Sequence, residues 1–555
     1  MIFLQIMLLQ KFSNLLLVLF GAFLLWAAWP SSSFTFLIFF SLIPLLYVED
    51  KVSSTRKFFR LTYLHMLLWN LMTTWWIYNA SGVGAAMAII LNSLIMCLPW
   101  LLMRIIKNRF GSSWGYLSLI SFWISFEWLH HTWELSWPWL TLGNSFAMQP
   151  SWVQWYEATG TPGGSLWVLL VNIIAYSLLK QYTTAGRTVK YFYLMGTLVA
   201  FLVAPILISS WIKKREAAAI RESEVASNKN VVVVQPNIDP YNEKFTAGTQ
   251  QNQIQKLISL SESKLDTNTA LVIWPETAIA VGVWEDQIAE NVYYQPIWNF
   301  LKRHPQVALL SGMDSYKSYG PDKRNATATA RFNEQENFYY DAFNASAMMR
   351  ADKSAQMYHK AKLVPGVETL PSFLLWMGSL FDDLGGTSGT LGRDKERVAL
   401  PDAQNYYVAA PVICYESIYS DYITDYIRKG ANLLTIMTND GWWGNTEGHR
   451  QHMNYATLRA IETRRWIARS ANTGISCFID PVGQIYQPLP WDIEGAIKMS
   501  IEPRQQKTFF VQHGDYLSYI FNGFSIILLV ITLTIMAKQR FKADKRSINA
   551  NGSNN

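Results

Sequence analysis

The sequence predicts a membrane domain of about eight helices joined to a large α/β domain. Half of the 555 residues are hydrophobic and 24 are tryptophan, whereas charged residues make up only 16 %, against roughly a quarter in soluble domains. Apolar runs dominate residues 1–215 and return near the C-terminus. Between them, from residue 230 to about 512, short apolar strands alternate with helical patterns, which is typical of an α/β domain.

Seven apolar runs in the first 215 residues are interpreted as helical spans, and an eighth lies near the C-terminus. Some are shorter than the roughly 20 residues that a helix needs to cross about 30 Å of hydrocarbon. The first run has no small-x-small cleavage site and is followed at once by further runs, so we expect it to be retained. The expected spans are 12–29, 34–48, 61–78, 83–106, 117–129, 166–179, 192–212 and 516–537.

Lysines and arginines in the connections predict the orientation. One alternate set of loops carries them, among them Lys51, Arg104, Lys180 and Lys538, whereas the other short loops carry none. By the positive-inside rule both termini are cytoplasmic, and the segment between spans seven and eight faces the other side. The expected domains are therefore listed as a membrane domain at 1–215, an extracytoplasmic domain at 229–512 after a polar linker at 216–229, a final helix at 516–537 and a cytoplasmic tail at 538–555.

The α/β domain is expected to contain seven strands and an arginine-bearing helix at 449–470. The net charge of +7 does not indicate a nucleic-acid partner, because the basic residues lie in short loops and not on one aromatic-laced element. Cys97 and Cys477 fit apolar core positions, and no metal-binding spacing of cysteine or histidine is present, so no metal is predicted. The expected strands are 231–234, 270–274, 307–311, 407–413, 433–437, 475–479 and 496–501.

Cys414 is the candidate nucleophile. It follows a β-branched apolar run at 407–413, and a buried strand that ends in a sharp turn lifts a side chain out of the sheet. An isolated cysteine is more often a core residue, because cysteine is among the most buried residue types. Two upstream segments favour the catalytic interpretation: one strand leads into Glu276, and a later segment carries Lys360.

These three residue types suit acyl transfer through a thioester. A free thiol has a pKa of about 8.5 and is mostly protonated at neutral pH. A carboxylate in a dry pocket can act as general base while the thiol attacks a carbonyl carbon. A lysine ammonium beside it favours the thiolate and stabilises the oxyanion of the tetrahedral intermediate. The chemistry requires no cofactor, because the acyl donor is already an activated ester.

Glutamate, lysine and cysteine in this order are the pattern of the nitrilase superfamily. Their placement between membrane spans resembles the apolipoprotein N-acyltransferase family of Gram-negative bacteria, over nearly the whole chain. That resemblance implies an extracytoplasmic nitrilase-like domain with the αββα sandwich fold. The matching motifs are WPETA at 274–278, KAKLVP at 360–365 with Glu368, CYE at 414–416, TNDGWWG at 438–444, RSANTG at 469–474, EWL at 127–129 and WPWL at 137–140.

The resemblance assigns roles to six residues. The second essential carboxylate of the family is Glu368, and the family's lysine stands eight residues before it, at Lys360. Lys362 is the alternative, because residues i and i+2 of a strand point the same way. The implied catalytic residues are Glu276 as base, Lys360 as oxyanion stabiliser and Cys414 as nucleophile, with supporting roles for Glu368, Tyr415 and Glu416.

Two segments depart from the family pattern. The family often has Pro-Phe-Gly-Glu before the second carboxylate, where this chain has Pro-Gly-Val-Glu at 365–368. Some members have an important tryptophan soon after the first strand, where this chain offers Tyr241, Lys244 and Phe245. No role is assigned to these three residues from the sequence.

The resemblance implies a two-step reaction in the bacterial inner membrane. Cys414 takes a fatty acyl group from a phospholipid, and the N-terminal amine of a diacylated apolipoprotein then attacks the thioester. The alternative enzyme is a membrane-tethered amidase or hydrolase that passes the acyl group to water. A transporter with a ligand-binding outer domain is disfavoured, because no matching pair of Gly/Pro-interrupted spans is present.

Several further residues admit two interpretations. The apolar segment at 371–377 suits either a lid that dips toward lipid or ordinary core packing. Glu127, inside a span, is expected to form structural hydrogen bonds between helices. His449 and His452 are expected to be polar residues at the start of a helix and not metal ligands, since no third ligand is evident.

Overall fold

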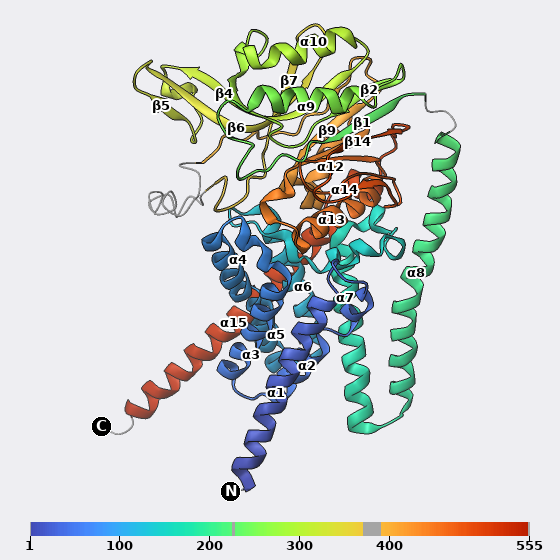
Figure 1. Ribbon diagram of the computed structural model, residues 1–555. Helices are drawn as coiled ribbons and strands as arrows, with labels where there is room; N and C mark the ends of the chain where they lie inside the picture. The colour runs from blue at the N-terminus through green and yellow to red at the C-terminus, as the bar shows by residue number, and fades with distance from the viewer. Residues whose placement is uncertain (1, 225–227, 370–389, 553–555) are drawn as a thin grey trace.

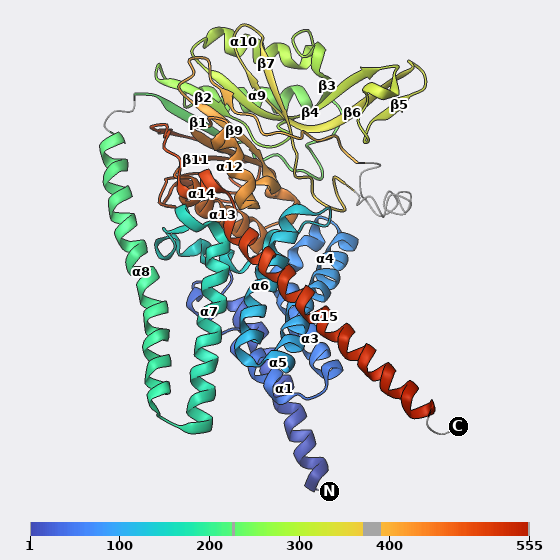
Figure 2. The ribbon, with the colours of Figure 1, turned by 180° about the vertical axis from the view of Figure 1, so that it is seen from behind.

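In the computed structural model, helices and sheets occupy opposite ends of the molecule (Figure 1). The structure describes residues 2–224, 228–369 and 390–552. Both chain termini lie at the helical end, away from the sheets, and the views from the two sides agree on this (Figure 2). The α/β part therefore lies at the end of the molecule opposite the two termini.

Among the residues that the structure describes, eight α-helices precede the first strand, and a long helix follows the last strand. In the described residues, four helical segments are long and apolar enough to cross a membrane: Gly82–Phe110, Tyr156–Ala185, Val189–Glu222 and Tyr516–Arg540. The helices are α1 (Ile2–Ala27), α2 (Ile43–Lys51), α3 (Thr55–Thr74), α4 (Gly82–Ile95), α5 (Cys97–Phe110), α6 (Ser112–Thr132), α7 (Tyr156–Ala185), α8 (Val189–Glu224) and α15 (Tyr516–Gly552).

The expected second span at 34–48 is wrong as a single helix. The segment forms a short 3₁₀ helix, Thr35–Phe39, and then α2, of nine residues, with a proline in its first turn. Asn172 of α7 satisfies the interrupted backbone: its amide oxygen accepts from Leu42 N at 2.9 Å and its nitrogen donates to Ile38 O at 2.9 Å. Irregular backbone is tolerated among membrane helices when protein groups pair it in this way.

Two expected boundaries also differ from the structure. The polar stretch after residue 215, expected as a linker, continues α8 as far as Glu224. The final helix likewise continues beyond 537 to Gly552, through the expected tail. The extension at 216–224 is rich in alanine and glutamate, and the extension at 538–552 is rich in lysine, arginine and alanine. These residues are good helix formers, so propensity extends both helices beyond their apolar parts.

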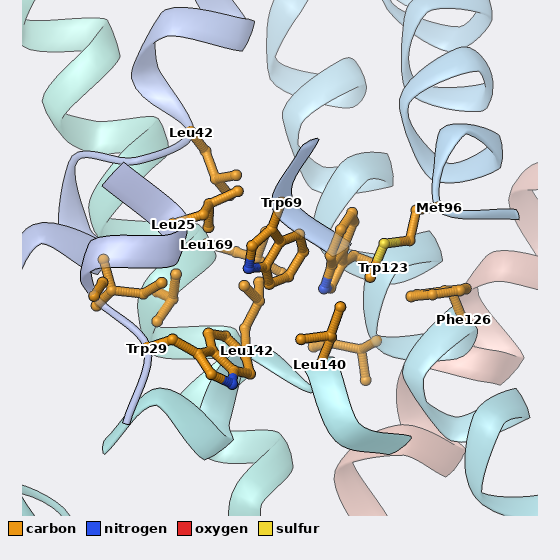
Figure 3. Packing of buried hydrophobic residues seen from close by; sticks show 14 of the residues in the cluster. Leu25, Trp29, Leu42, Trp69, Met96, Trp123, Phe126, Leu140, Leu142 and Leu169 are labelled. Carbon is orange, nitrogen blue, oxygen red and sulfur yellow. The ribbon is translucent and has the colours of Figure 1, made fainter. Parts of the chain in front are cut away.

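The helical part has a core of large apolar side chains (Figure 3). Trp29 and Trp69 meet edge to face, with ring centroids 5.4 Å apart. Leu140 and Leu142, from the irregular segment between α6 and α7, fill the same core and are almost fully buried. Loop residues as well as helices therefore build this core.

The α/β part contains two stacked sheets. The first has eight strands in the order β14-β1-β2-β4-β6-β5, with β3 paired to β4 and β7 paired to β6; the second has the order β13-β12-β11-β10-β9-β8. The first sheet comprises β1 (Asn230–Gln235), β2 (Thr269–Ile273), β3 (Ile279–Trp284), β4 (Ala308–Gly320), β5 (Arg331–Asn333), β6 (Phe338–Met349), β7 (Ala355–His359) and β14 (Gly495–Ser500). The second comprises β8 (Leu400–Pro401), β9 (Val408–Ile413), β10 (Leu433–Thr438), β11 (Ile467–Ala471), β12 (Ser476–Ile479) and β13 (Ile485–Leu489).

Alternation along β1 shows how the sheets are layered. Val231 and Val233 belong to the core between the sheets, whereas Val232 and Val234 pack with α9 (Gln250–Glu262) and α10 (Gln295–Arg303). Successive strand side chains point to opposite faces, so a run of four valines serves two cores. With α12 (Ser420–Arg428) and α13 (Glu447–Thr463) on the far side of the second sheet, the result is the expected αββα sandwich (Figure 1).

All seven expected strands coincide with observed strands, but the helix expected at 449–470 is wrong over its last part. The helix α13 ends at Thr463, because Arg464 adopts a left-handed conformation with φ of 51°. Residues Ile467–Ala471 instead form β11, a buried strand parallel to β10. The sequence does not reveal this strand, because its region contains arginines that are buried in the structure. In a sequence, arginines usually indicate the exposed face of a helix.

Side chains from the α/β part enter the core of the helical part. Tyr415, Tyr419 and Tyr455 belong to the same buried cluster as the tryptophans described above. Trp29 Nε1 donates to Tyr455 OH at 2.9 Å. The segment after β9 and the helix α13 are thus fixed directly to the helical part.

Candidate active site

Cys414 lies at the tip of a tight turn at the carboxyl end of β9. Its φ of +49° is in the left-handed region, which is uncommon for residues other than glycine. The chain then enters the short 3₁₀ helix Cys414–Ile418. Strained residues held by their surroundings concentrate at functional sites. The turn lifts the thiol from the sheet as the sequence predicts, although the side chain stays mostly covered, with 8 % of Cys414 exposed.

Glu276 follows β2 and reaches the same place from the first sheet. Its Oε1 accepts hydrogen bonds from Lys360 Nζ at 3.0 Å and Asn344 Nδ2 at 2.9 Å, and its Oε2 accepts from Asn439 N at 3.1 Å. The loop is pressed against Gly312 of β4, where an added Cβ would lie 2.6 Å from Glu276 Cα. A glycine is therefore required at 312 for the glutamate to reach its position.

Lys360 follows β7 and joins two carboxylates. Its Nζ donates to Glu276 Oε1 at 3.0 Å and to Glu368 Oε1 at 2.8 Å, and its side chain is 1 % exposed. Glu368 Oε2 accepts from Val364 N at 2.8 Å, which fixes that carboxylate on its own turn. The structure thus brings together Glu276, Lys360 and Glu368, which span 92 positions of the sequence from first to last.

Asn344 is a residue of this cluster that the sequence analysis missed. It lies on β6, and its Nδ2 donates both to Glu276 Oε1 and to Glu368 Oε1, each at 2.9 Å. Its backbone carbonyl accepts from Lys360 N at 2.9 Å. One asparagine therefore places both carboxylates and the lysine. Its only sequence signal was a position inside an unrecognised strand with many small residues.

Glu416 joins the turn of Cys414 to the loop that follows Lys360. Its Oε2 accepts from Ile413 N at 2.9 Å, while its Oε1 accepts from Ala361 N at 2.8 Å and from Tyr358 OH at 2.6 Å. The residue is fully buried. A buried carboxylate is stable here because it accepts several hydrogen bonds. These contacts hold the two segments in place relative to each other.

Lys362 and Tyr415 both face the helical part. Lys362 Nζ donates to His131 O at 2.8 Å, at the end of α6, and so points away from the cluster around Glu276. Tyr415 OH donates to Ser136 O at 2.8 Å. Of the two candidate lysines, the structure places Lys360 and not Lys362 beside the carboxylates.

A second buried hydrogen-bond network, formed by His452, Asp440 and Arg469, contacts the backbone carbonyl of Cys414. His452 lies with Nε2 3.1 Å from Cys414 O and with Nδ1 2.9 Å from Asp440 Oδ1. Asp440 Oδ2 accepts from Arg469 at 2.7 Å, and all three residues are essentially without solvent exposure. His452 does lie in the first turns of a helix, as expected, but its contact with the nucleophile's carbonyl could not be predicted from spacing.

The charged groups around Cys414 shift one another's pKa values. Burial and the neighbouring Glu276 carboxylate raise the pKa of the Cys414 thiol well above its ordinary value. Burial also opposes ionisation of Glu276, yet Lys360 and Asn344 hold the pKa of Glu276 below its ordinary value. The pKa of Lys360, which burial alone would lower, is raised well above its ordinary value by Glu276 and Glu368. The resting site is therefore a neutral thiol beside an ionised carboxylate and an ammonium group.

Lys244 is a second buried lysine beside the candidate base. Its Nζ donates to Glu276 O at 3.0 Å, and 2 % of the residue is exposed. Burial lowers the pKa of Lys244 to about 8. The neighbouring Tyr241 and Phe245 are more than half exposed and pack against Trp442. Aromatic residues thus do occupy the region where the family pattern has a tryptophan.

His359, immediately before Lys360, lies between two carboxylates. Its Nδ1 lies 2.9 Å from Asp394 Oδ1 and its Nε2 lies 2.6 Å from Glu285 Oε1. Although burial opposes it, these two carboxylates raise the pKa of His359 to about 9. These contacts join the end of β7 to the segments that carry Glu285 and Asp394, directly before Lys360.

Other residues singled out in the sequence have simpler environments. Glu127 accepts from Trp123 Nε1 of its own helix at 2.9 Å and from Leu142 N, in the irregular segment after α6, at 2.7 Å, so these two structural bonds are not the expected bonds between long helices. Cys97 and Cys477 are buried. In the described part of the chain, no group of His, Cys, Asp or Glu side chains is arranged to hold a metal ion. The apolar segment at 371–377 lies outside the described residues.

Two family models match the chain. Residues 21–174 match the apolipoprotein N-acyltransferase N-terminal domain, and residues 230–507 match carbon-nitrogen hydrolase. An amidase of the nitrilase superfamily from Nesterenkonia AN1 aligns with 53 % of this chain and 97 % of its own, at 12 % identity and a TM-score of 0.35.

Curated relatives match over most of their length. A protein of Chlorobaculum tepidum named apolipoprotein N-acyltransferase is 30 % identical over 91 % of this chain and 93 % of its own. One of the same name from Thermotoga maritima is 24 % identical over 90 % of this chain and 89 % of its own. The similarity thus extends over both the helical part and the sheets.

Proposed function

Because the chain belongs to the apolipoprotein N-acyltransferase family, we propose that it transfers a fatty acyl group from a phospholipid to the N-terminal amine of the diacylglyceryl-cysteine of apolipoproteins. The enzyme is a membrane-associated acyltransferase. The single observation that carries the mechanism is the ion-paired cluster of Glu276, Lys360 and Glu368 around the turn that presents Cys414. In the mechanism Glu276 is the base, Lys360 the oxyanion stabiliser and Cys414 the nucleophile.

The first half-reaction forms the thioester. The Cys414 sulfur attacks the ester carbonyl carbon of the phospholipid while its proton passes to Glu276. Proton transfer removes one of the two negative charges that Lys360 balances, so its ammonium is available to the developing oxyanion. When the ester C–O bond breaks, Glu276 returns the proton to the leaving oxygen, and a lysophospholipid departs.

The second half-reaction forms an amide. The α-amine of the apolipoprotein attacks the thioester carbon, the amine's proton passes to Glu276, and the C–S bond breaks. The thiol is regenerated when that proton reaches the sulfur. Burial of Cys414 and Glu276 disfavours attack by water. The hydrolase alternative is not favoured by the relatives, which are named acyltransferases.

The proposed location is the bacterial inner membrane, with the domain at 229–512 in the periplasm and both termini in the cytoplasm. Two observations support it: the basic residues concentrate in one alternate set of loops, and the termini lie at the end of the molecule away from the sheets (Figure 2). Protease added to spheroplasts should then cleave within 229–512 and leave tags on both termini intact. Loss of either tag would contradict this orientation.

Transfer is tested by the fate of the acyl-enzyme. We expect the fatty-acyl mass on purified wild-type protein to persist in buffer and to disappear on adding a diacylglyceryl-cysteine peptide, which gains the acyl group. The matched control is the same peptide with an acetylated α-amine, which should not accept. Equal decay with both peptides and in buffer alone, with release of free fatty acid, would establish a hydrolase instead.

A further inference from the structure

Two cations lie over one aromatic ring at the junction of the catalytic and helical parts. Arg397 has its guanidinium carbon 4.2 Å from the centroid of the Tyr422 ring, and Lys362 Nζ lies 5.9 Å from the same centroid. Lys362 Nζ is also 4.7 Å from the ring centroid of Tyr419. A cation over an aromatic face is stabilised, but two cations sharing a ring repel each other.

Neither cation is neutralised by a carboxylate. Within the described ranges, no Asp or Glu oxygen lies within ion-pair distance of Lys362 or Arg397. Glu416, the carboxylate nearby, uses its oxygens to accept from Ile413 N, Ala361 N and tyrosine hydroxyls. Among the described residues, these two cations are therefore without a direct ion pair, although Glu416 and Asp421 act on Lys362 from farther away.

Hydrogen-bond donors are left over as well. Lys362 Nζ donates to His131 O at 2.8 Å, and one guanidinium nitrogen of Arg397 donates to Lys395 O at 2.5 Å. The Nε atom of Arg397 is buried, and in the described part of the chain it has no acceptor. An ammonium offers three donors and a guanidinium five, in a fork that matches phosphate. Donors of both kinds are thus available to an anion.

The lowered pKa of Lys362 is what two neighbouring cations without a bound anion would produce. Burial, Arg397 and the exposed Arg393 lower the pKa of Lys362 to about 8, although Glu416 and Asp421 oppose the shift. An anion placed between the cations would reverse this effect. Partly buried like charges without a counter-ion are costly, and such groups are normally paired or bind a ligand.

The position of the cations points to a phosphate group as the anion. Lys362 is two residues after Lys360 and bonds the last turn of α6, so it lies between the catalytic cluster and the helices. In a glycerophospholipid the phosphate is a few bonds away from the ester that is cleaved. We propose that Lys362 and Arg397, assisted by Arg393, form a subsite for the phosphate group of the phospholipid acyl donor. This inference rests on the proposed function and adds the recognition of the donor.

The test compares donors with and without phosphate. Thioester formation is measured with dipalmitoyl-phosphatidylethanolamine and with p-nitrophenyl palmitate, an uncharged ester, in the same micelles. The variants are Lys362→Gln, Arg397→Gln and the two combined. Arg324→Gln is the matched control, because Arg324 is an exposed arginine whose ion pair in the described residues is with Asp322. Inorganic phosphate is added to distinguish free phosphate from a lipid headgroup.

We expect each variant to raise the KM for the phospholipid about tenfold or more, since each loses a charge-assisted hydrogen bond. The maximal rate of thioester formation at saturating phospholipid, and the rate with p-nitrophenyl palmitate, should stay at the wild-type level. Inhibition of wild type by inorganic phosphate, absent in the double variant, would support a site open to both sources of phosphate. No inhibition together with the KM effect would support a site specific for the lipid headgroup.

Two results would overturn the subsite alone: an unchanged KM for the phospholipid, or an equal loss with both donors. The second result would assign the cations to folding or to catalysis in general. If wild-type protein formed no thioester with either donor, the proposed function itself would fall, and the subsite with it.

Discussion

Asn344 gives the most specific prediction about the site. Like Lys360, its amide nitrogen donates to both Glu276 and Glu368, while its Oδ1 has no partner in the described residues. Asn344→Ala therefore removes the two bonds and little else. Asn344→Asp has nearly the same shape but places a third carboxylate between two others.

The expected magnitudes follow from these contacts. A hydrogen bond to a charged group contributes about 1.5–3 kcal/mol. Because Lys360 still donates to both carboxylates in the alanine variant, we expect a loss of about 2 kcal/mol, or thioester formation roughly 30-fold slower. In the aspartate variant the added charge also raises the pKa of Glu276. Its activity should then be lost at a higher pH than that of wild type as the pH falls.

The assay is single-turnover thioester formation on Cys414, followed by intact mass between pH 5 and pH 8. Asn325→Ala, in an exposed loop, is the control. We expect slow reaction in Asn344→Ala with the wild-type pH profile, and a profile displaced to higher pH in Asn344→Asp. A wild-type rate and profile in the aspartate variant would refute the inference that Asn344 holds the two carboxylates together.

Three other substitutions test the surroundings of the site. His359→Gln should flatten the pH dependence of thermal stability, because the pKa of His359 is raised from 6.5 to about 9. The protonated histidine then contributes about 3 kcal/mol of stability, which is complete below pH 6.5 and is lost as the pH rises through 9. Equal melting profiles of variant and wild type would contradict this. Gly312→Ala should reduce thioester formation at least tenfold, because its Cβ would meet the loop of Glu276 at 2.6 Å, and a wild-type rate would show that the loop is free to shift. Lys244→Met should displace the acid limb of the rate profile to higher pH, because the ammonium helps to lower the pKa of Glu276, and an unmoved limb would limit Lys244 to a structural role.

Much of the catalytic half could be predicted from the sequence, because buried strands of a doubly covered sheet are continuous apolar runs. The run before Cys414 and the run before Glu276 are of this kind, and both were predicted as strands. The strand that carries Asn344 was not, since its apolar positions are interrupted by alanine, serine and asparagine. Small polar residues are buried there by hydrogen bonds that no local pattern reveals.

The failures among the helices have a common physical origin. The segment at 34–48 is apolar enough for a span, but it is interrupted and its free backbone groups bond to Asn172 of a distant helix. Arg469 lies in a strand because Asp440 neutralises it inside the fold. Both depend on tertiary partners far along the chain, which composition and periodicity do not report. The contact between His452 and Cys414 O is of the same kind.

The central claim is that Cys414 itself carries the acyl group. The most direct measurement is intact mass and peptide mapping of detergent-purified protein after incubation with phospholipid, for wild type and Cys414→Ala. We predict one fatty-acyl addition in wild type, mapped to the peptide that contains Cys414, released by hydroxylamine and absent from the variant. An acyl addition that persists in Cys414→Ala, or no addition in a folded wild-type enzyme that still acylates its acceptor, would contradict the thioester mechanism.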